Sequence, residues 1–460
     1  MRRNAVRRSA WRCFAVVAPG VLVSAVMFSP GARAATSSVP PPTSDPFYAA
    51  PSNLASVPPG TVLRSRTVIV SVDPGTAVTT AVSATAEQYP AYQLLYRTNG
   101  ASGQPVANVT TLIVGAGTQP VGGRELVSLQ DAEDSVDPDC APSYQLQVGE
   151  NAPNGDSNST LAEEMQSMVP WLEQGYDVVV PDPEGPDSEF MVSAMAAHAV
   201  LDSIRAVEQF APAELGGATT PVGLWGYSGG AFETTAANEQ QPAYAPDVHL
   251  VAAAAGGVPV GGEETIQWLD GSTEAGIMMV AAIGIDRAYP QMGLYSFLNA
   301  AGLAFAQTAS TGCATFGGGA AFTRFDSWTT VPNAWQLPQV QQVLTANELG
   351  QAVPKTPAFY YNAIRDELVW VQPLDQLVAA DCAGGAPINY YRDPTALEHT
   401  EGGVTFGVVS EAFLAARFAG TPVPDSCGQP GNAVAGTGLV PAPTVNWGWG
   451  PNLLSGSTGG

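Results

Sequence analysis

The order of hydrophobic and polar positions divides the chain into a strand-rich first part and an alternating second part. Short apolar runs bounded by Gly, Pro or Asn predict strands at 66–72, 92–97, 109–114 and 126–129. Beyond residue 130 the pattern predicts helices at 160–174, 191–210, 230–238, 372–380 and 405–419, separated by strands at 176–180, 221–225, 248–254, 358–363 and 387–391. Strands that alternate with helices predict an α/β fold with a mostly parallel central sheet and helices on both faces.

One long stretch interrupts this alternation. Residues 256–351 are rich in Gly and Ala, contain apolar helical segments at 277–288 and 295–307, and show no clear strand. An insertion of this length in a regular α/β chain favours a helical cap or lid over a bare loop. We therefore expect a cap set into a core formed by 61–255 and 352–427. A small separate domain without a catalytic role is the alternative.

The two ends of the chain have compositions of their own. Residues 1–13 carry five arginines and no acid, the run 14–28 is apolar, and Ala32-Arg33-Ala34 follows. This order is typical of a secretory signal peptide, residues 1–34, with cleavage after Ala34; an uncleaved membrane anchor is the alternative. Residues 35–60 predict an extended arm, and residues 428–460 form a Gly/Pro/Ser-rich tail.

Charge and cysteine content narrow the class of protein. Acids outnumber bases 41 to 17, which argues against a nucleic-acid partner because phosphate binding needs a basic face. Four cysteines follow the predicted signal peptide, at 140, 313, 382 and 427. In a secreted chain they predict two disulfides, with three pairings open. No Cys-x-x-Cys motif or histidine cluster offers a zinc site, so we expect neither a metal nor another cofactor.

The motif at 226–230, Gly-Tyr-Ser-Gly-Gly, fits Gly-x-Ser-x-Gly and lies between a predicted strand and a predicted helix. This is the setting of a nucleophile elbow, in which Ser228 projects from a strained turn. The following helix would supply backbone N–H groups and a positive dipole where an oxyanion forms. The alternative is a Gly-rich strand-to-helix turn with a non-catalytic serine, which would have the same sequence motif.

A serine nucleophile requires a base. His198 lies in a predicted helix and His249 opens a strand, whereas His399 lies downstream in a predicted loop. The chain order Ser, acid, His of α/β-hydrolases therefore selects His399.

The acid of such a triad is expected at a strand end between Ser228 and His399. Asp366 directly follows the predicted strand 358–363, and its neighbour Glu367 would partly replace it. The competing acids are Asp375, Asp381 and Asp393. The position at the strand end favours Asp366.

Several further segments resemble the secretory lipase family typified by Candida antarctica lipase A, a family of α/β-hydrolases with many bacterial members. The matching segments are Glu133-Asp134-Ser135 with 140–144, 180–186, 201–206, the elbow, Arg365-Asp366-Glu367 and the His399 loop, within residues 90–427. The resemblance implies the triad Ser228, Asp366 and His399. It further implies an oxyanion hole from the backbone amides of Gly229 and Asp134, disulfides 140–313 and 382–427, and a helical lid at 256–351.

Together these features predict a secreted serine hydrolase that cleaves carboxylic esters of lipids, acylglycerols first, through an acyl-enzyme on Ser228. The expected partner is a lipid ester substrate, with transient contact between the cap and a lipid interface. One alternative is an esterase or acyltransferase acting on other lipids or acylated glycans. Another is a non-catalytic lipid-binding protein on a hydrolase fold.

Overall fold

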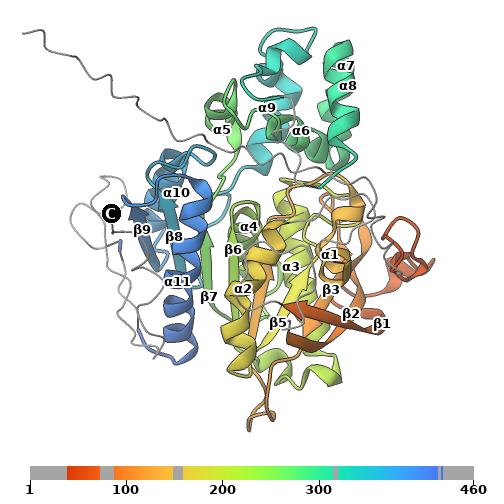
Figure 1. The fold of residues 1–460 in the computed structure, drawn as a ribbon, viewed down its shortest axis with the longest axis vertical. Helices are drawn as coiled ribbons and strands as arrows, with labels where there is room; N and C mark the ends of the chain where they lie inside the picture. The colour runs from red at the N-terminus through yellow and green to blue at the C-terminus, as the bar shows by residue number, and fades with distance from the viewer. Residues whose placement is uncertain (1–38, 73–86, 149–158, 314–319, 423–425, 428–460) are drawn as a thin grey trace, which may run out of the picture. The chain divides into compact units, whose positions relative to one another are not determined.

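The computed structural model describes residues 39–72, 87–148, 159–313, 320–422 and 426–427 (Figure 1). Their strands form one sheet in the order β1-β2-β3-β5-β4-β6-β7-β8-β9. The strands are β1 (Val62–Val72), β2 (Glu87–Asn99), β3 (Pro105–Ile113), β4 (Leu126–Gln130), β5 (Asp177–Pro181), β6 (Val222–Tyr227), β7 (Leu250–Gly256), β8 (Ala358–Ala363) and β9 (Ile388–Asp393).

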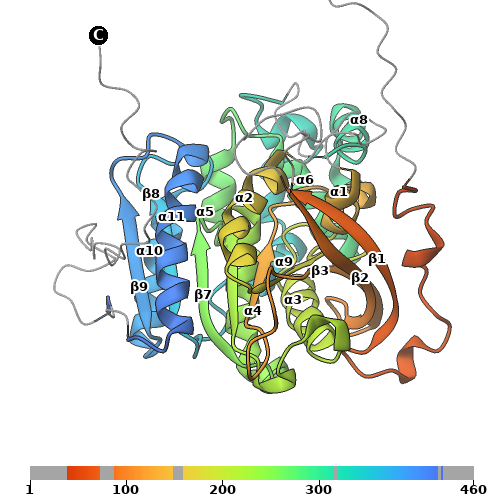
Figure 2. The same cartoon turned by 60° about the horizontal axis from the view of Figure 1, so that its bottom comes forward.

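The sheet changes character along its width. Strands β1, β2, β3 and β5 pair antiparallel, whereas β5, β4, β6, β7, β8 and β9 pair parallel. Figure 2 shows β1 and β2 at one edge and β9 at the opposite edge. The parallel part brings the carboxyl ends of its strands to one edge, where the loops that carry the candidate site begin.

Helices cover both faces of the sheet, as the alternating pattern predicts. On one face α2 (Ser159–Glu173) and α11 (His399–Phe418) pack against side chains such as Val178, Val180 and Phe359. On the other face α3 (Ser193–Glu208), α4 (Gly229–Tyr244) and α10 (Val371–Ala383) cover side chains such as Val179 and Tyr360. Successive residues of a strand point to opposite faces of the sheet, and both faces are covered by helices. This explains why the strands are continuous apolar runs. A shorter helix, α1 (Pro142–Val148), follows the loop after β4.

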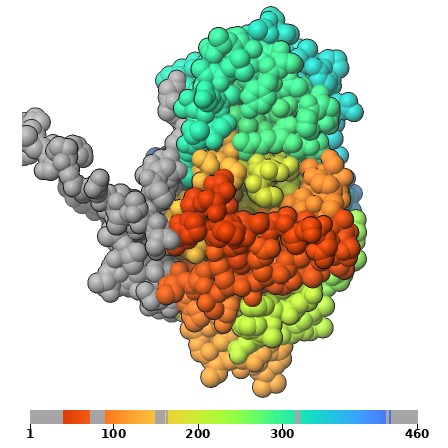
Figure 3. Space-filling view, turned by 90° about the vertical axis from the view of Figure 1, so that its right-hand side faces the viewer, coloured from red at the N-terminus to blue at the C-terminus, as the bar shows by residue number. Residues whose placement is uncertain are grey.

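The expected cap is helical. It contains α5 (Gly262–Leu269), α6 (Ile277–Ala288), α7 (Leu294–Phe297), α8 (Ala300–Ala309) and α9 (Pro338–Asn347). These helices lie over the carboxyl ends of the strands (Figure 1), and Figure 3 shows the cap as a lobe beyond the N-terminal strands. The buried side chains of the cap share one hydrophobic cluster with Phe190 and Met195 of the core. Movement of 256–351 as a lid remains a prediction.

One boundary prediction is wrong in a way that affects the site. The chain pattern places His399 in a loop before a helix starting near 405, but α11 begins at His399 itself. Glu398 caps the helix by accepting hydrogen bonds from the N–H groups of Thr400 and Glu401. The following Gly402-Gly403 pair lowers the helical propensity of this turn, which conceals the true helix start.

The termini and cysteines complete the description. The predicted signal peptide, its cleavage site and most of the C-terminal tail lie outside the described residues. The structure links Cys140 to Cys313 and Cys382 to Cys427. Among the helices of the described ranges, none has the length and apolar character needed to cross a membrane.

Candidate active site

The strand β6, residue Ser228 and helix α4 form the sharp turn expected of a nucleophile elbow. Ser228 has φ 55° and ψ −122°, a strained conformation for a residue with a side chain. A Cβ at Gly226 would lie 2.1 Å from the Gly230 carbonyl oxygen, and one at Gly230 would lie 2.0 Å from the Gln130 carbonyl oxygen. The two glycines are therefore required by the close approach of strand, helix and β4.

The three predicted triad residues form one chain of hydrogen bonds. His399 Nε2 lies 2.8 Å from Ser228 Oγ, and His399 Nδ1 lies 2.7 Å from Asp366 Oδ2. The other oxygen of Asp366, Oδ1, accepts hydrogen bonds from the N–H groups of Leu368 at 3.0 Å and Val369 at 2.6 Å. The exposed fractions of Ser228, Asp366 and His399 are only 8%, 3% and 8%. The arrangement can remove a proton from Ser228 and hold the resulting imidazolium against a carboxylate.

Two opposing effects act on the imidazole. Burial alone lowers the pKa of His399, but the hydrogen bond and charge of Asp366, assisted by the charges of Asp134 and Glu367, outweigh it and raise the pKa above its usual value. A histidine with a raised pKa and its Nε2 on a serine hydroxyl is suited to general-base catalysis.

Further contacts hold the backbone of His399. The Tyr227 hydroxyl donates a hydrogen bond to the His399 carbonyl oxygen at 2.7 Å, and the His399 N–H donates to Glu367 Oε2 at 3.0 Å. The Glu367 carboxylate therefore contacts the backbone of His399 and lies outside the hydrogen-bond chain from Asp366 to Ser228. Sequence reasoning missed both supports, because neither residue type nor spacing indicates which backbone group a side chain will reach.

The competing residues have other partners. Asp375 accepts a hydrogen bond from the Tyr390 hydroxyl at 2.8 Å, Asp393 accepts one from the Tyr361 hydroxyl at 2.8 Å, and Asp381 lies 3.5 Å from the Tyr360 hydroxyl. His198 stacks on Tyr244 with ring centroids 4.1 Å apart, and His249 is exposed. The structure places none of these five residues in the hydrogen-bond chain described above.

The loop after β4 brings Asp134 close to Ser228. Asp134 has φ 46° and lines the same pocket as Ser228 and Gly229. A Cβ added at Gly229 would lie 1.9 Å from Asp134 Oδ1, so the two predicted oxyanion-hole residues are in direct contact. Burial raises the pKa of Asp134 to about 6, against the lowering effect of His399.

A group of buried acids lies in and around this loop, and sequence reasoning did not identify it. We call it the buried acid cluster; its members are Asp131, Glu133, Glu164, Glu184 and Glu233. Burial first, and then the charges of neighbouring carboxylates, raise the pKa values of Glu133, Glu164, Glu184 and Glu233 well above their ordinary value. An apolar interior and neighbouring carboxylates both disfavour the ionised form of these groups.

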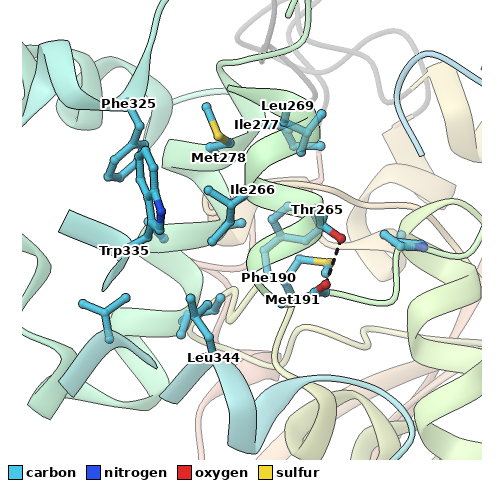
Figure 4. Close-up of a pocket in the computed structure, with 18 of the residues that line it drawn as sticks. Phe190, Met191, Thr265, Ile266, Leu269, Ile277, Met278, Phe325, Trp335 and Leu344 are labelled. Carbon is cyan, nitrogen blue, oxygen red and sulfur yellow. Dashed lines mark hydrogen bonds between the residues drawn. The ribbon is translucent and has the colours of Figure 1, made fainter. Parts of the chain in front are cut away.

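The pocket that opens at Ser228 is apolar. Asp134, Ser228 and Thr265 supply polar groups, and the remaining lining is aliphatic and aromatic, much of it from the cap. In Figure 4, Phe325 and Trp335 lie together on one side of the pocket, and Phe190 and Met191 lie on the other. The Thr265 hydroxyl already donates to the Gly261 carbonyl oxygen at 2.8 Å. Such a lining suits a hydrocarbon chain.

In the described ranges, no group of three or more His, Cys, Asp or Glu side chains is arranged to hold a metal ion.

Comparison with known proteins identifies the family. The family model for secretory lipases matches residues 153–426. The chain is 33% identical to lipase A of Moesziomyces aphidis over 86% of this chain and 85% of that protein, and 33% identical to the trichothecene C-3 esterase of Fusarium sporotrichioides over 81% and 83%. The crystal structure of Candida antarctica lipase A in its closed state superposes with a TM-score of 0.76 and 31% identity, covering 85% of this chain and 90% of that one.

These matches confirm the resemblance and the α/β-hydrolase fold that the sequence predicts. The chain belongs to the secretory lipase family and is a carboxylic ester hydrolase.

Proposed function

We propose that the protein hydrolyses acylglycerols through an acyl-enzyme on Ser228. The observation that carries the proposal is the continuous path of hydrogen bonds from Asp366 through His399 to Ser228 Oγ, which ends at an apolar pocket. A hydroxyl so placed can attack an ester carbonyl, while the pocket receives the acyl chain. A non-catalytic lipid-binding protein would need the pocket but not the hydrogen-bond path.

The chemistry runs in two halves. His399 Nε2 takes the proton of Ser228 Oγ as the oxygen bonds to the ester carbon, and the carbonyl oxygen becomes an oxyanion. As the carbon–oxygen bond to the leaving alcohol breaks, the imidazolium gives its proton to that alcohol. Water then attacks the acyl-enzyme by the same route, releasing a fatty acid and restoring Ser228. Asp366 stabilises the imidazolium at Nδ1 in both halves.

We assign the oxyanion hole to the backbone amides of Gly229 and Asp134. Gly229 opens helix α4, whose N-terminus favours negative charge, and the contact between Gly229 and Asp134 keeps both residues beside the nucleophile. Preorganised donors of this kind typically contribute about 10²- to 10³-fold each to kcat.

The secretory family and the two disulfides support an extracellular protein, for which we propose cleavage after Ala34. The cap exposes large apolar side chains, which supports its transient contact with a lipid interface. These residues are Tyr295, Leu303, Phe322 and Val331.

Hydrolysis of an emulsified triacylglycerol, compared with p-nitrophenyl esters of two to eighteen carbons, tests the proposed substrate class. We expect fatty-acid release from the emulsion and higher kcat/KM for acyl chains of eight or more carbons than for acetate. Activity confined to acetate and other short, soluble esters would contradict the assignment to acylglycerols, while leaving the ester chemistry intact.

A further inference from the structure

We propose that Glu367 is a positioning residue for the base His399, and that its peptide group couples the cap helix α5 to that base. The inference rests on the proposed triad. It concerns the short loop between β8 and α10, called here the acid loop, residues 364–370. Three contacts of this loop, and one from Tyr227 to the same base, meet at the catalytic centre or at the cap.

The first contact lies at the start of α11. The N–H groups of Thr400 and Glu401 donate hydrogen bonds to the side chain of Glu398. The N–H of Leu397 donates to the side chain of Glu401. The N–H of His399 instead donates to Glu367 Oε2, outside the helix, at 3.0 Å. The backbone of the base is thus fixed to the acid loop by a bond that is separate from the one between imidazole and Asp366.

The second contact completes the fixation. The Tyr227 hydroxyl, on the residue before the nucleophile, holds the His399 carbonyl oxygen at 2.7 Å. Both backbone polar groups of His399 are therefore bound by side chains, one from the elbow and one from the acid loop. Since these bonds fix the Cα of the base, they set the distance from Nε2 to Ser228 Oγ, on which proton transfer depends.

The third contact joins the same residue to the cap. The indole Nε1 of Trp268, on α5, donates a hydrogen bond to the Glu367 carbonyl oxygen at 2.9 Å. The Trp268 ring also stacks on Trp370 of the acid loop, with centroids 5.3 Å apart and planes 5° from parallel. Trp268 is 38% exposed, so this attachment lies at the surface. Glu367 thus binds the cap through its carbonyl group and the base through its carboxylate.

The fourth contact shows that the acid loop also faces the substrate pocket. Leu368 and Val369 line the pocket, and their N–H groups hold Asp366 Oδ1. Helix α5 lines the same pocket through Thr265, Ile266 and Leu269. A displacement of α5 would therefore move a loop that carries Asp366 and binds the backbone of His399. The cap is coupled to the triad through this loop.

Two substitutions at Glu367 separate its charge from its hydrogen bond. Glu367→Gln keeps an acceptor for the His399 N–H but removes a negative charge that favours the imidazolium. We expect the acidic limb of the kcat/KM profile to move to lower pH, with a nearly unchanged plateau. Glu367→Ala removes the acceptor as well as the charge. In addition to the shift of the pH profile, kcat should fall by about 10- to 100-fold at constant KM, because the base is misplaced. Glu398→Gln is the matched comparison, since Glu398 lies at the same helix end without bonding His399; its kcat should stay within about threefold of wild type.

The coupling to the cap is tested with Trp268→Phe, which keeps an aromatic ring on Trp370 but loses the indole donor. The loss of one hydrogen bond should lower kcat by about two- to tenfold on a soluble p-nitrophenyl ester. In a Glu367→Ala background the same change should have little further effect on kcat, because the path from the cap through the Glu367 carboxylate to the His399 backbone is already cut.

A different set of results would overturn the inference. If the Glu367 variants only lower the melting temperature, with kcat and the pH profile unmoved, the residue has a structural role alone. If the effects of Trp268→Phe and Glu367→Ala multiply, the cap does not act through Glu367. Ester hydrolysis by the wild-type protein keeps these failures distinct from a failure of the proposed function, in which the wild type itself would be inactive.

Discussion

Replacement of Asp366 by Asn tests the assignment of the triad acid with almost no change of shape. The acceptor Oδ1 is held by the N–H groups of Leu368 and Val369, so the asparagine oxygen should occupy that place. Its NH₂ group would then face His399 Nδ1, which lies 2.7 Å from the second carboxylate oxygen in the native protein. The imidazole would have to accept at Nδ1 and carry its proton on Nε2.

That tautomer points a proton at Ser228 Oγ, and the base can no longer receive one. The imidazolium would also lose its carboxylate partner. In serine proteases the equivalent change lowers kcat by about 10⁴-fold, or about 5 kcal/mol of transition-state stabilisation. We expect a loss of this size in Asp366→Asn with KM nearly unchanged, measured as initial rates on p-nitrophenyl butyrate across the pH range.

Asp375→Asn provides a matched control. Asp375 is also a buried carboxylate, but its partners are Tyr390, from whose hydroxyl it accepts a hydrogen bond, and Arg392 at 3.3 Å, neither of which belongs to the proposed triad. This variant should lose thermal stability while keeping kcat within about threefold, since its contacts do not reach the reacting atoms. Near-full activity in Asp366→Asn, together with an essential role for Asp375, Asp381 or Asp393, would refute the assignment.

Three further outcomes follow from the packing around the site. The four glutamates of the buried acid cluster have pKa values raised on folding, so above the unfolded value near 4.3 the native state binds more protons than the unfolded chain, and the free energy of unfolding from urea titrations should fall as the pH rises above that value. Glu184→Gln should flatten this slope, whereas a flat or rising wild-type curve would contradict the raised pKa values. Removing the Cys140–Cys313 disulfide by a double change to Ser should cost about 2–4 kcal/mol, seen as a lower melting temperature in calorimetry, and an unchanged melting temperature would contradict it. Gly229→Ala puts a Cβ against the Asp134 carboxylate, so kcat should fall about 10²-fold with little change in KM, and full activity in rate assays would show that the contact between Gly229 and Asp134 does not position the oxyanion hole.

The sequence is most informative where the chemistry demands a particular backbone. The elbow is recognisable because Gly226 and Gly230 exclude any side chain, and the strand before it because both of its faces are buried. Asp366 is recognisable because acids of this fold follow strand ends. The start of helix α11 at His399 is not recognisable from the sequence. Two glycines weaken the helical pattern there and conceal the capping role of Glu398.

Other features depend on contacts between distant segments, which a single sequence does not display. Glu133, Glu184 and Glu233 look like surface residues, because a glutamate is almost never fully buried without a partner. Their burial arises only when the loop after β4, the loop after β5 and helix α4 come together. The bond between Trp268 and Glu367 joins residues 99 positions apart and is equally invisible from local pattern.

The rate of ester hydrolysis by Ser228→Ala tests the central claim most directly. The substitution removes one oxygen from a residue whose strained backbone remains compatible with a small side chain, so the fold and the melting temperature should change little. The account predicts a loss of about 10⁶-fold in kcat on p-nitrophenyl butyrate, as expected when the nucleophile of a triad is deleted. A folded Ser228→Ala protein that keeps more than a few per cent of wild-type activity would contradict it.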